Sequence, residues 1–253
     1  MSLAIDLSGR TAVVTGASRG IGRAICRTLA EAGADIIGVS SAGLPPESET
    51  ARLVAETGRS FSGAACDFSI REAVTALAEQ LAARQDISIL VNNAGTIRRA
   101  PAADHPLADW DDVMAVNCDA PFILTQALGK AMLARGHGHV VFVASVLSFQ
   151  GGILVPGYAA SKGAVAQLVR AFANEWAAHG VNVNGIAPGY IATDNTQALQ
   201  EDAAREAALM ARVPAGRWGK PEEIAAPVAF LCSDLARFIH GAIIPADGGW
   251  LAR

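Results

Sequence analysis

The stretch "TAVVTGASRGIG", residues 11–22, decides the fold class. An apolar run typical of a strand ends in a glycine-rich turn, and a segment with helical periodicity follows. Gly16, Gly20 and Gly22 let the backbone bend tightly and approach a phosphate, and a helix that begins there favours an anion. The spacing is G-x-x-x-G-x-G, not the more familiar G-x-G-x-x-G. We therefore predict a pyrophosphate site from the strand–turn–helix context, with a plain tight turn as the alternative.

The rest of the chain repeats this alternation of strand and helix. Short β-rich runs occur at 11–16, 35–40, 87–93, 139–145, 181–189 and 241–249, with a weaker run at 60–67. Ala- and Leu-rich stretches with helical periodicity lie between them, such as 20–32, 69–84 and 158–179. Continuous apolar strands separated by helices predict a parallel sheet covered on both faces, so we expect a single doubly wound α/β domain over residues 1–253.

Residues 190–219 fit the alternation least well. We expect them to form a helical excursion over the ligand crevice, where such segments act as lids.

Composition excludes several classes of protein. The 253 residues carry 20 basic and 24 acidic side chains, a formal charge of 20 − 24 = −4, which gives no support for nucleic-acid binding. The amino terminus "MSLAIDLSGR" is not typical of a signal peptide, and no stretch approaches the roughly 20 apolar residues of a membrane helix. The four cysteines lie apart and predict reduced thiols, three of them buried, so we expect a cytoplasmic location. Since the five histidines are scattered, no metal site is expected.

Polar residues follow several of the predicted strands. In "LVNNAG", residues 90–95, two adjacent asparagines end a strand, where they either bridge neighbouring loops or bind a ligand. Asn117 lies inside a largely apolar helical stretch and on its own would be read as a helix-face amide. Ser145 precedes Tyr158 and Lys162, which share one helix face at i and i+4. The lysine is either packed beside the phenol or makes it more acidic.

Taken together and in this order, "TGASRGIG", "NNAG", Asn117, Ser145 and Y-A-A-S-K resemble the short-chain dehydrogenase/reductase family over essentially the whole chain. The resemblance implies a Rossmann-like sheet of seven parallel strands and a nicotinamide cofactor. It also implies a catalytic tetrad of Asn117, Ser145, Tyr158 and Lys162. Tyr158 would exchange the substrate proton, because Lys162 and the oxidised nicotinamide would lower the pKa of its phenol. Ser145 would hold the substrate oxygen, Lys162 would also bind the ribose, and Asn117 would hold a water.

The same resemblance implies a set of cofactor-binding residues around the strand ends. They are Gly16, Ser18, Arg19, Gly20, Ile21, Gly22, Ser40, Asp67, Asn93, Gly95, Tyr158, Lys162, Pro188, Gly189, Ile191 and Thr193. Asp67 would contact the adenine ring. The second strand ends in Ser40 and Ser41 without the acid that binds a ribose 2′-hydroxyl, and Arg19 permits a 2′-phosphate. We expect NAD(P), with the resemblance favouring NAD slightly.

Segments near the expected substrate crevice are similar to the 2-dehydro-3-deoxy-D-gluconate 5-dehydrogenase branch of the family. They include "NNAGTIRRAP", "SFQGG" and "VPAGRWGKPEE". Gluconate 5-dehydrogenases and 3-oxoacyl-carrier-protein reductases are the alternatives. A sugar acid brings a carboxylate, which suits an arginine fork. The candidate substrate residues are Arg98, Arg99, Gln150, Arg217 and Trp218, although each arginine could equally be an exposed solubilising side chain.

Two further expectations concern the role and the assembly of the chain. Some proteins of this fold only bind nucleotide, as sensors or scaffolds, but they typically lose the tyrosine or the lysine, and this chain retains both. The resemblance implies a homotetramer. An apolar terminus with Trp250 and Leu251 would lie at a subunit contact, since such residues are seldom left in solvent. The alternative is that Trp250 folds onto its own core.

Overall fold

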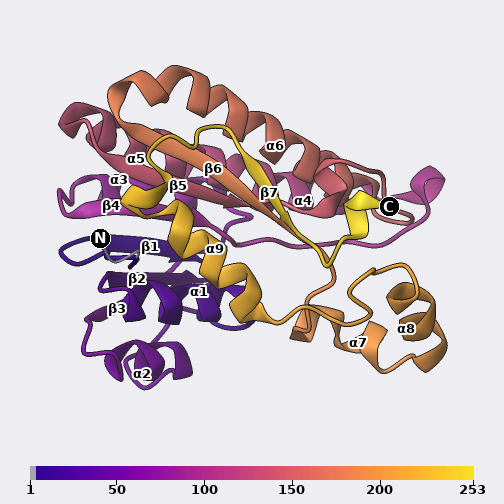
Figure 1. The fold of residues 1–253 in the computed structure, drawn as a ribbon. Helices are drawn as coiled ribbons and strands as arrows, with labels where there is room; N and C mark the ends of the chain where they lie inside the picture. Colours follow the sequence, from indigo (N-terminus) through magenta and orange to yellow (C-terminus); the bar gives the residue numbers. More distant parts are fainter. Residues whose placement is uncertain (1–3) are drawn as a thin grey trace.

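Seven short strands form one parallel sheet in the order β3-β2-β1-β4-β5-β6-β7 (Figure 1). The computed structural model describes residues 4–253, apart from the side chains of Asn195 and Ala198. The strands lie close to the predicted runs, which confirms the Rossmann-like α/β fold. They are β1 (Thr11–Thr15), β2 (Asp35–Ser40), β3 (Phe61–Ala65), β4 (Ile87–Asn92), β5 (Gly138–Val143), β6 (Val181–Pro188) and β7 (Ile243–Ala246).

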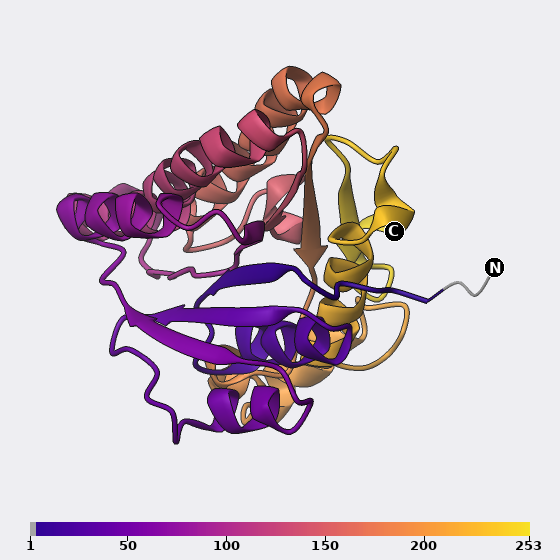
Figure 2. The same ribbon diagram turned by 90° about the vertical axis from the view of Figure 1, so that its left-hand side faces the viewer.

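Helices cover both faces of the sheet (Figures 1 and 2). One layer contains α1 (Gly20–Glu31), α2 (Glu49–Ala55) and α9 (Pro221–Leu231). The other contains α3 (Arg71–Ala82), α5 (Ala120–Arg135) and α6 (Pro156–Trp176), with α4 (Leu107–Met114) beside α6. The single-turn elements are η1 (Ala102–Asp104), η2 (Ala115–Asp119), η3 (Val146–Ser148), η4 (Ala177–His179), η5 (Asp194–Thr196), η6 (Asp234–Ala236) and η7 (Trp250–Ala252).

Alternate residues of each strand pack into the two layers. In β1, Ala12 and Val14 contact the cluster beneath α1 and α9, whereas Val13 belongs to the cluster beneath α3, α5 and α6. This period of two is the ordinary pleat of a strand whose two faces are both buried. The strands read as continuous apolar runs in the sequence because both of their faces are buried.

The chain reverses its direction of travel across the sheet between β1 and β4. From β1 it proceeds outward to β2 and β3, and then returns to β4 on the other side of β1. Ligands of open α/β sheets bind outside the carboxyl ends of the strands at such a reversal. The glycine turn after β1 and the two asparagines that begin at the end of β4 lie at this point.

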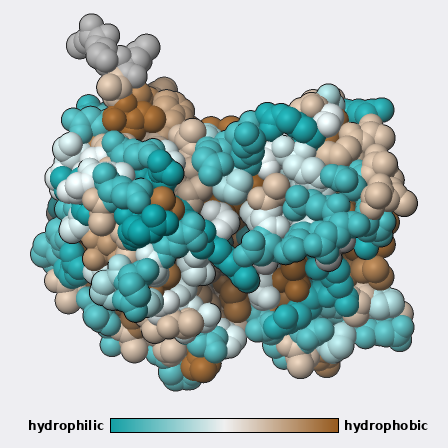
Figure 3. All heavy atoms as spheres, turned by 90° about the horizontal axis from the view of Figure 1, so that it is seen from below, coloured by the Kyte–Doolittle hydropathy of each residue, from teal (hydrophilic) through white to brown (hydrophobic). Residues whose placement is uncertain are grey.

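The 190–219 segment contains η5, α7 (Gln197–Gln200) and α8 (Ala203–Met210). Its two ends are tied together, since Ala192 donates its N–H to the Gly219 carbonyl at 2.9 Å and Gly219 donates to Tyr190 at 2.9 Å. When the molecule is viewed from below relative to Figure 1, its surface is mainly hydrophilic, with separate hydrophobic patches (Figure 3). That the segment acts as a lid stays a prediction.

The carboxyl-terminal residues pack within their own chain. Trp250 is 7% exposed and is buried with Val146 and Val213. The expectation that Trp250 needs a partner subunit to leave solvent is therefore wrong, because Tyr190 and the 190–219 segment already cover it.

The thiols and the helices agree with the sequence reading. All four cysteines are free; Cys26, Cys66 and Cys232 are buried and Cys118 is half-buried. Burial raises the pKa of the Cys232 thiol to about 12, so this thiol stays protonated at neutral pH. Among residues 4–253, none of the helices is long and apolar enough to span a membrane.

Candidate active site

The glycine turn brings the end of β1 against the first turn of α1. Gly16 has φ of +66°, which glycine adopts without strain. A Cβ on Gly22 would lie 2.1 Å from the Gly16 carbonyl oxygen, so no larger residue fits there. The turn is thus closely packed, and the first N–H groups of α1 have no acceptor within the helix.

The asparagine pair at the end of β4 bridges loops. Asn93 donates its side-chain amide to the Thr15 carbonyl at 2.8 Å, while the Thr15 hydroxyl accepts from the Asn93 and Ala94 N–H groups, both at 2.9 Å. Asn92 donates to the Thr125 hydroxyl at 2.9 Å. The structure thus shows the bridging contacts, and direct contact of Asn93 with a ligand stays a prediction. Thr15 was missed in the sequence, where a lone threonine at a strand end carries no distinctive signal.

The other expected cofactor residues lie along the carboxyl edge. Ser40 ends β2 and donates its hydroxyl to the Gly43 carbonyl at 2.8 Å. The Asp67 carboxylate follows β3 and accepts from the backbone and hydroxyl of Ser69, which lower its pKa. Arg19 lies 3.4 Å from the Asp194 carboxylate across the site. The remaining members follow β1, β4 and β6: Ser18, Gly20, Ile21, Gly95, Pro188, Gly189, Ile191 and Thr193.

Asn117 lies in η2, a π-helical turn between α4 and α5, and is buried. Its side-chain oxygen accepts from the Thr96 N–H at 2.8 Å, and its amide donates to the Thr96 carbonyl at 2.9 Å and to the Ser161 hydroxyl at 3.0 Å. Ser161 in turn donates to the Tyr158 carbonyl at 2.8 Å. Asn117 therefore ties the loop after β4 to the first turns of α6. A water held by Asn117 stays a prediction.

Ser145 follows β5 and caps η3. Its hydroxyl oxygen accepts from the Leu147 N–H at 3.1 Å, which leaves the hydroxyl proton free to be donated elsewhere. The side chain of Ser145 lowers the pKa of Tyr158, although burial, which is the larger influence, raises it.

Tyr158 and Lys162 lie one turn apart near the start of α6. The Lys162 ammonium is 5.6 Å from the centre of the Tyr158 ring and donates to the Val143 carbonyl at 2.8 Å. Burial lowers the pKa of Lys162 to about 8. Burial also raises the pKa of Tyr158 above its usual value, and this outweighs Ser145 and the charge of Arg99, which lower it. In the protein alone, desolvation disfavours the phenolate. That Lys162 and an oxidised nicotinamide together lower the pKa of Tyr158 stays a prediction.

The structure separates three arginines that the sequence treated alike. Arg217 forms a two-bond fork with Glu223, at 2.8 and 2.6 Å, and Arg98 pairs with Asp112 at 2.8 Å. A substrate carboxylate would have to displace these partners. Arg99 makes no ion pair within the described part of the chain, and its charge acts on Tyr158.

The two remaining substrate candidates differ in their surroundings. Trp218 donates its indole N–H to Glu206 of α8 at 2.9 Å. Gln150 is half-buried in the loop after η3. The side chains of residues 4–253 contain no group of three His, Cys, Asp or Glu that could hold a metal ion.

The chain resembles known proteins along its whole length. The family profile described as enoyl-(acyl carrier protein) reductase matches residues 16–251. A 2-dehydro-3-deoxy-D-gluconate 5-dehydrogenase from Pseudoalteromonas atlantica is 56% identical over 98% of both chains. Relatives of the same name from Bacillus subtilis and Escherichia coli are 50% and 45% identical, each over 99% of this chain and 98% of the relative.

Solved structures agree with this relationship. A candidate 2-deoxy-D-gluconate 3-dehydrogenase from Agrobacterium tumefaciens, with bound NADP, has a TM-score of 0.93 and 49% identity over all of both chains. A gluconate 5-dehydrogenase from Burkholderia cenocepacia, in complex with NADP and tartrate, has a TM-score of 0.90 and 38% identity over 98% of both chains. These findings confirm the resemblance seen in the sequence: the chain belongs to the short-chain dehydrogenase/reductase family and is an oxidoreductase that acts on CH–OH groups.

Proposed function

We propose that the protein oxidises the C5 hydroxyl of 2-dehydro-3-deoxy-D-gluconate, or reduces the matching diketo acid, with NADP(H) as the hydride carrier. The observation that carries the substrate is the 56% identity, over 98% of both chains, to a protein of that name. Gluconate 5-dehydrogenase is the second candidate, favoured by a structural neighbour that is 38% identical.

The residues present fit a dinucleotide. Gly16 and Gly22 let the turn pack tightly against Asn93, since a Cβ on either would lie within 2.9 Å of the Asn93 amide nitrogen. The turn precedes the N-terminus of α1 and lies where the strand order reverses, which is where such sheets bind a pyrophosphate. Lys162, Asn93 and Gly95 would border the nicotinamide half, and Asp67 the adenine. A bound nicotinamide dinucleotide would supply the acceptor or donor of the hydride.

Tyr158 would move the substrate proton, and Ser145 would orient the substrate oxygen. The Ser145 hydroxyl already has its oxygen occupied by the Leu147 N–H, so its proton is available to the substrate. The buried Lys162 ammonium, 5.6 Å from the ring centre, and a positive nicotinamide would together offset the burial that raises the pKa of Tyr158. Asn117 holds the loop after β4 and α6 together and would hold a water that leads the proton to solvent.

We propose NADP as the cofactor in place of NAD, which the sequence had slightly favoured. Both structural neighbours described above contain NADP, and the expected preference for NAD has no support among them. The end of β2 supplies Ser40 and Ser41 with no acid to repel a 2′-phosphate. Arg19 lies across the site and is only weakly held by Asp194, at 3.4 Å between two exposed side chains.

Arg99 is the best-supported anchor for the substrate carboxylate. The loop that carries it is held at Thr96 by Asn117 and at Ala100, whose N–H donates to the Leu154 carbonyl at 3.0 Å. Arg98 pairs with Asp112 of α4, whereas the positive charge of Arg99 lowers the pKa of Tyr158. An exposed guanidinium that makes no ion pair among the described residues, and whose charge lowers the pKa of Tyr158, suits a sugar acid.

A panel assay tests this function. The purified protein is assayed with 2-dehydro-3-deoxy-D-gluconate, gluconate, a neutral hexitol and an acetoacetyl thioester. The first three are tested with NAD⁺ and with NADP⁺, and the thioester, which is reduced, with NADH and with NADPH. We expect the highest kcat/KM with the deoxy keto acid and NADP(H). A higher value with gluconate would favour the second candidate. A higher value with the hexitol or the thioester would remove the sugar-acid proposal.

We also propose a homotetramer in the cytoplasm. Exposed apolar side chains support the assembly, notably Phe238, which is 100% exposed, and Phe122, which borders a groove with Phe172 on α5 and α6. Free cysteines are compatible with a reducing compartment. Light scattering at micromolar concentration should give four times the chain mass, and a monomer would contradict the assembly.

A further inference from the structure

The last residues of the chain pack against the loop after Ser145 and against both ends of the 190–219 segment. Trp250 packs with Val146, the residue after Ser145, and with Val213 of the 190–219 segment. The Tyr190 ring, at the start of that segment, is 4.9 Å from the Trp250 ring at an interplanar angle of 64°. Arg212 belongs to the part of the same segment that leads back toward the sheet. Its guanidinium lies 4.0 Å from the centre of the Trp250 ring.

Backbone and side-chain hydrogen bonds fasten the terminus in this position. Ala215 donates to the Gly248 carbonyl at 3.0 Å, and Arg253 donates to the Ala211 carbonyl at 2.9 Å. The Asp247 carboxylate accepts from the N–H groups of Gly249 and Leu251, both at 2.9 Å. Residues 211–215 of the 190–219 segment are thus tied to the chain terminus. Gly189, which follows β6, also lies close to the terminus, since a Cβ there would be 2.6 Å from the Asp247 Cα atom.

This cluster is separate from the two large clusters that hold the sheet to its helices. Among the described residues, its buried members are Val146, Val213 and Trp250, and partly buried residues of α8 and of the terminus surround them. The Trp250 indole N–H is buried with no hydrogen-bond partner among the described residues, which costs stability. A position selected for stability alone would be better filled by a side chain without that N–H.

We propose that Trp250 is a positioning residue for the substrate side of the site. Its ring holds Tyr190 and the 211–219 stretch against the loop that carries Ser145. The substrate then meets a wall of fixed shape, and its reacting carbon is held in line with Tyr158. Because the contacts are made by apolar faces and a stacked guanidinium, an aromatic ring should suffice and an aliphatic side chain should not. The use of a sugar acid as the kinetic probe rests on the proposed function.

The experiment compares Trp250→Leu with Trp176→Leu. Trp176 is a matched control, because it is also 7% exposed but packs against Phe172 at the far end of α6. We expect Trp250→Leu to raise KM for the sugar acid about tenfold, since misplaced substrate loses much of its alignment, with the Kd for NADPH unchanged. Trp250→Phe should restore KM to within about twofold, and Trp176→Leu should lower only Tm.

Hydrogen exchange supplies a readout that needs no substrate. Amides of residues 203–219 should exchange faster in Trp250→Leu and not in Trp176→Leu. If the protein turns over no sugar acid, the proposed function fails while exchange still tests the positioning role. Unchanged KM and exchange in Trp250→Leu, or the same KM rise in Trp176→Leu, would overturn the proposal. Should Trp250→Leu not fold, Arg212→Met must raise exchange in 203–219, and no rise would likewise overturn it.

Discussion

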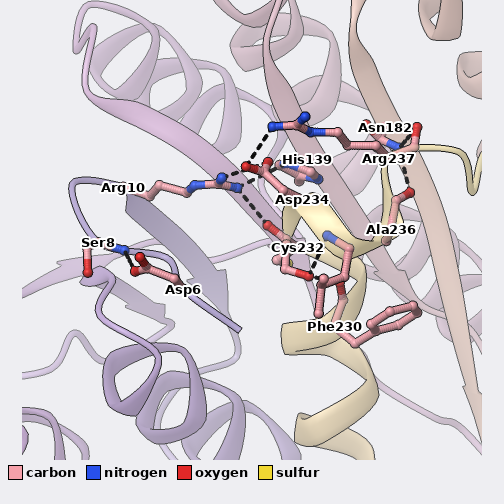
Figure 4. Close-up of polar contacts among 12 residues, drawn as sticks. Asp6, Ser8, Arg10, His139, Asn182, Phe230, Cys232, Asp234, Ala236 and Arg237 are labelled. Carbon is pink, nitrogen blue, oxygen red and sulfur yellow. Dashed lines mark hydrogen bonds and ion pairs between the residues drawn. The ribbon is translucent and has the colours of Figure 1, made fainter. Parts of the chain in front are cut away.

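At the amino edge of the sheet, Arg10 is bound on every side by its own chain, whereas at the carboxyl edge Arg99 forms no ion pair within the described residues. The Arg10 guanidinium donates to the Cys232 carbonyl at 3.0 Å and to Asp234 at 2.8 Å, and it lies 3.2 Å from His139 Nε2 (Figure 4). The same residue type therefore closes the fold at one edge and stays available to a ligand at the other.

Asparagines show the same difference. At the amino edge, Asn182 donates its amide to the carbonyls of Ala236, Arg237 and Ile239, and this connection holds η6 to β6 (Figure 4). At the carboxyl edge, Asn117 also binds backbone, but what it orders is the loop and the helix turn that carry Thr96 and Tyr158. At the amino edge, Arg10 and Asn182 thus bind groups of their own chain, although the buried Nδ1 of His139 has no hydrogen-bond partner among the described residues. At the carboxyl edge, Asn117 orders the segments that carry the proposed tetrad.

The strongest test of this comparison between the two edges of the sheet removes the hydroxyl group of Tyr158. Tyr158→Phe should reduce kcat by about two to four orders of magnitude, the range for losing a general acid–base, with little change in Tm or in NADPH affinity. Tyr190→Phe is the control, because Tyr190 is the other tyrosine and lies outside the proposed tetrad; its kcat should stay within about threefold. A Tyr158→Phe enzyme that keeps a tenth of the activity would remove Tyr158 from its role.

At the amino edge, acid should act through His139. Burial, followed by the charges of Arg10 and His137, lowers its pKa to about 4, while Asp234 opposes this. As the pH falls below 6.5, His139 becomes protonated in the unfolded chain, whereas in the folded protein it stays neutral until about pH 4. Stability is therefore lost across this window, by about 3 kcal/mol, and is fully present above it.

His139→Gln should flatten that part of the acid limb in denaturant titrations at several pH values. His179→Gln, at an exposed position in η4, is the control and should leave the curve unchanged. Parallel wild-type and His139→Gln curves between pH 6.5 and 4 would show that His139 does not cause the acid sensitivity.

Arg10→Ala should lower the free energy of unfolding by about 2 kcal/mol, since the Cys232 carbonyl and the His139 imidazole lose this donor and Asp234 keeps only its exposed partner Arg237. Its side chain is only 14% exposed. Arg237→Ala removes another partner of the same Asp234, but from a side chain that is 73% exposed, and should cost less than about 0.5 kcal/mol. Both variants should keep the wild-type kcat per folded molecule. Lost turnover at unchanged stability would contradict a purely structural amino edge.

The smallest effect is expected at the proposed carboxylate anchor. Arg99→Ala should raise KM for sugar acids about tenfold, the value of a charge-assisted hydrogen bond. Arg217→Ala should change KM by less than about twofold, because the guanidinium of Arg217 is already paired with Glu223. The reverse order, with Arg217 dominant, would mean that the substrate displaces Glu223 and that Arg99 is only an exposed charge.

Most of the fold could be predicted from the sequence because its signals are local. The strand runs around β1 and β5 and the glycine turn at Gly16 depend on residues next to each other in the chain. The pairing of Tyr158 with Lys162 depends on a spacing of one helical turn. The role of Asn117 was not visible in this way, since it joins Thr96 to Ser161, residues 21 and 44 positions away.

The sequence by itself thus determined the parallel sheet, the glycine turn after β1 and the pairing of Tyr158 with Lys162, because each follows from short-range pattern, whereas the tetrad as a set was implied by the family resemblance. Only the tertiary structure decided which arginine is left unpaired, that Trp250 is buried by its own chain, and that burial raises the pKa of Tyr158. These outcomes depend on groups brought together from distant parts of the chain, as Arg10 meets Asp234 across 224 positions. The energy of a charged or buried side chain is set by those neighbours, and no local pattern records them.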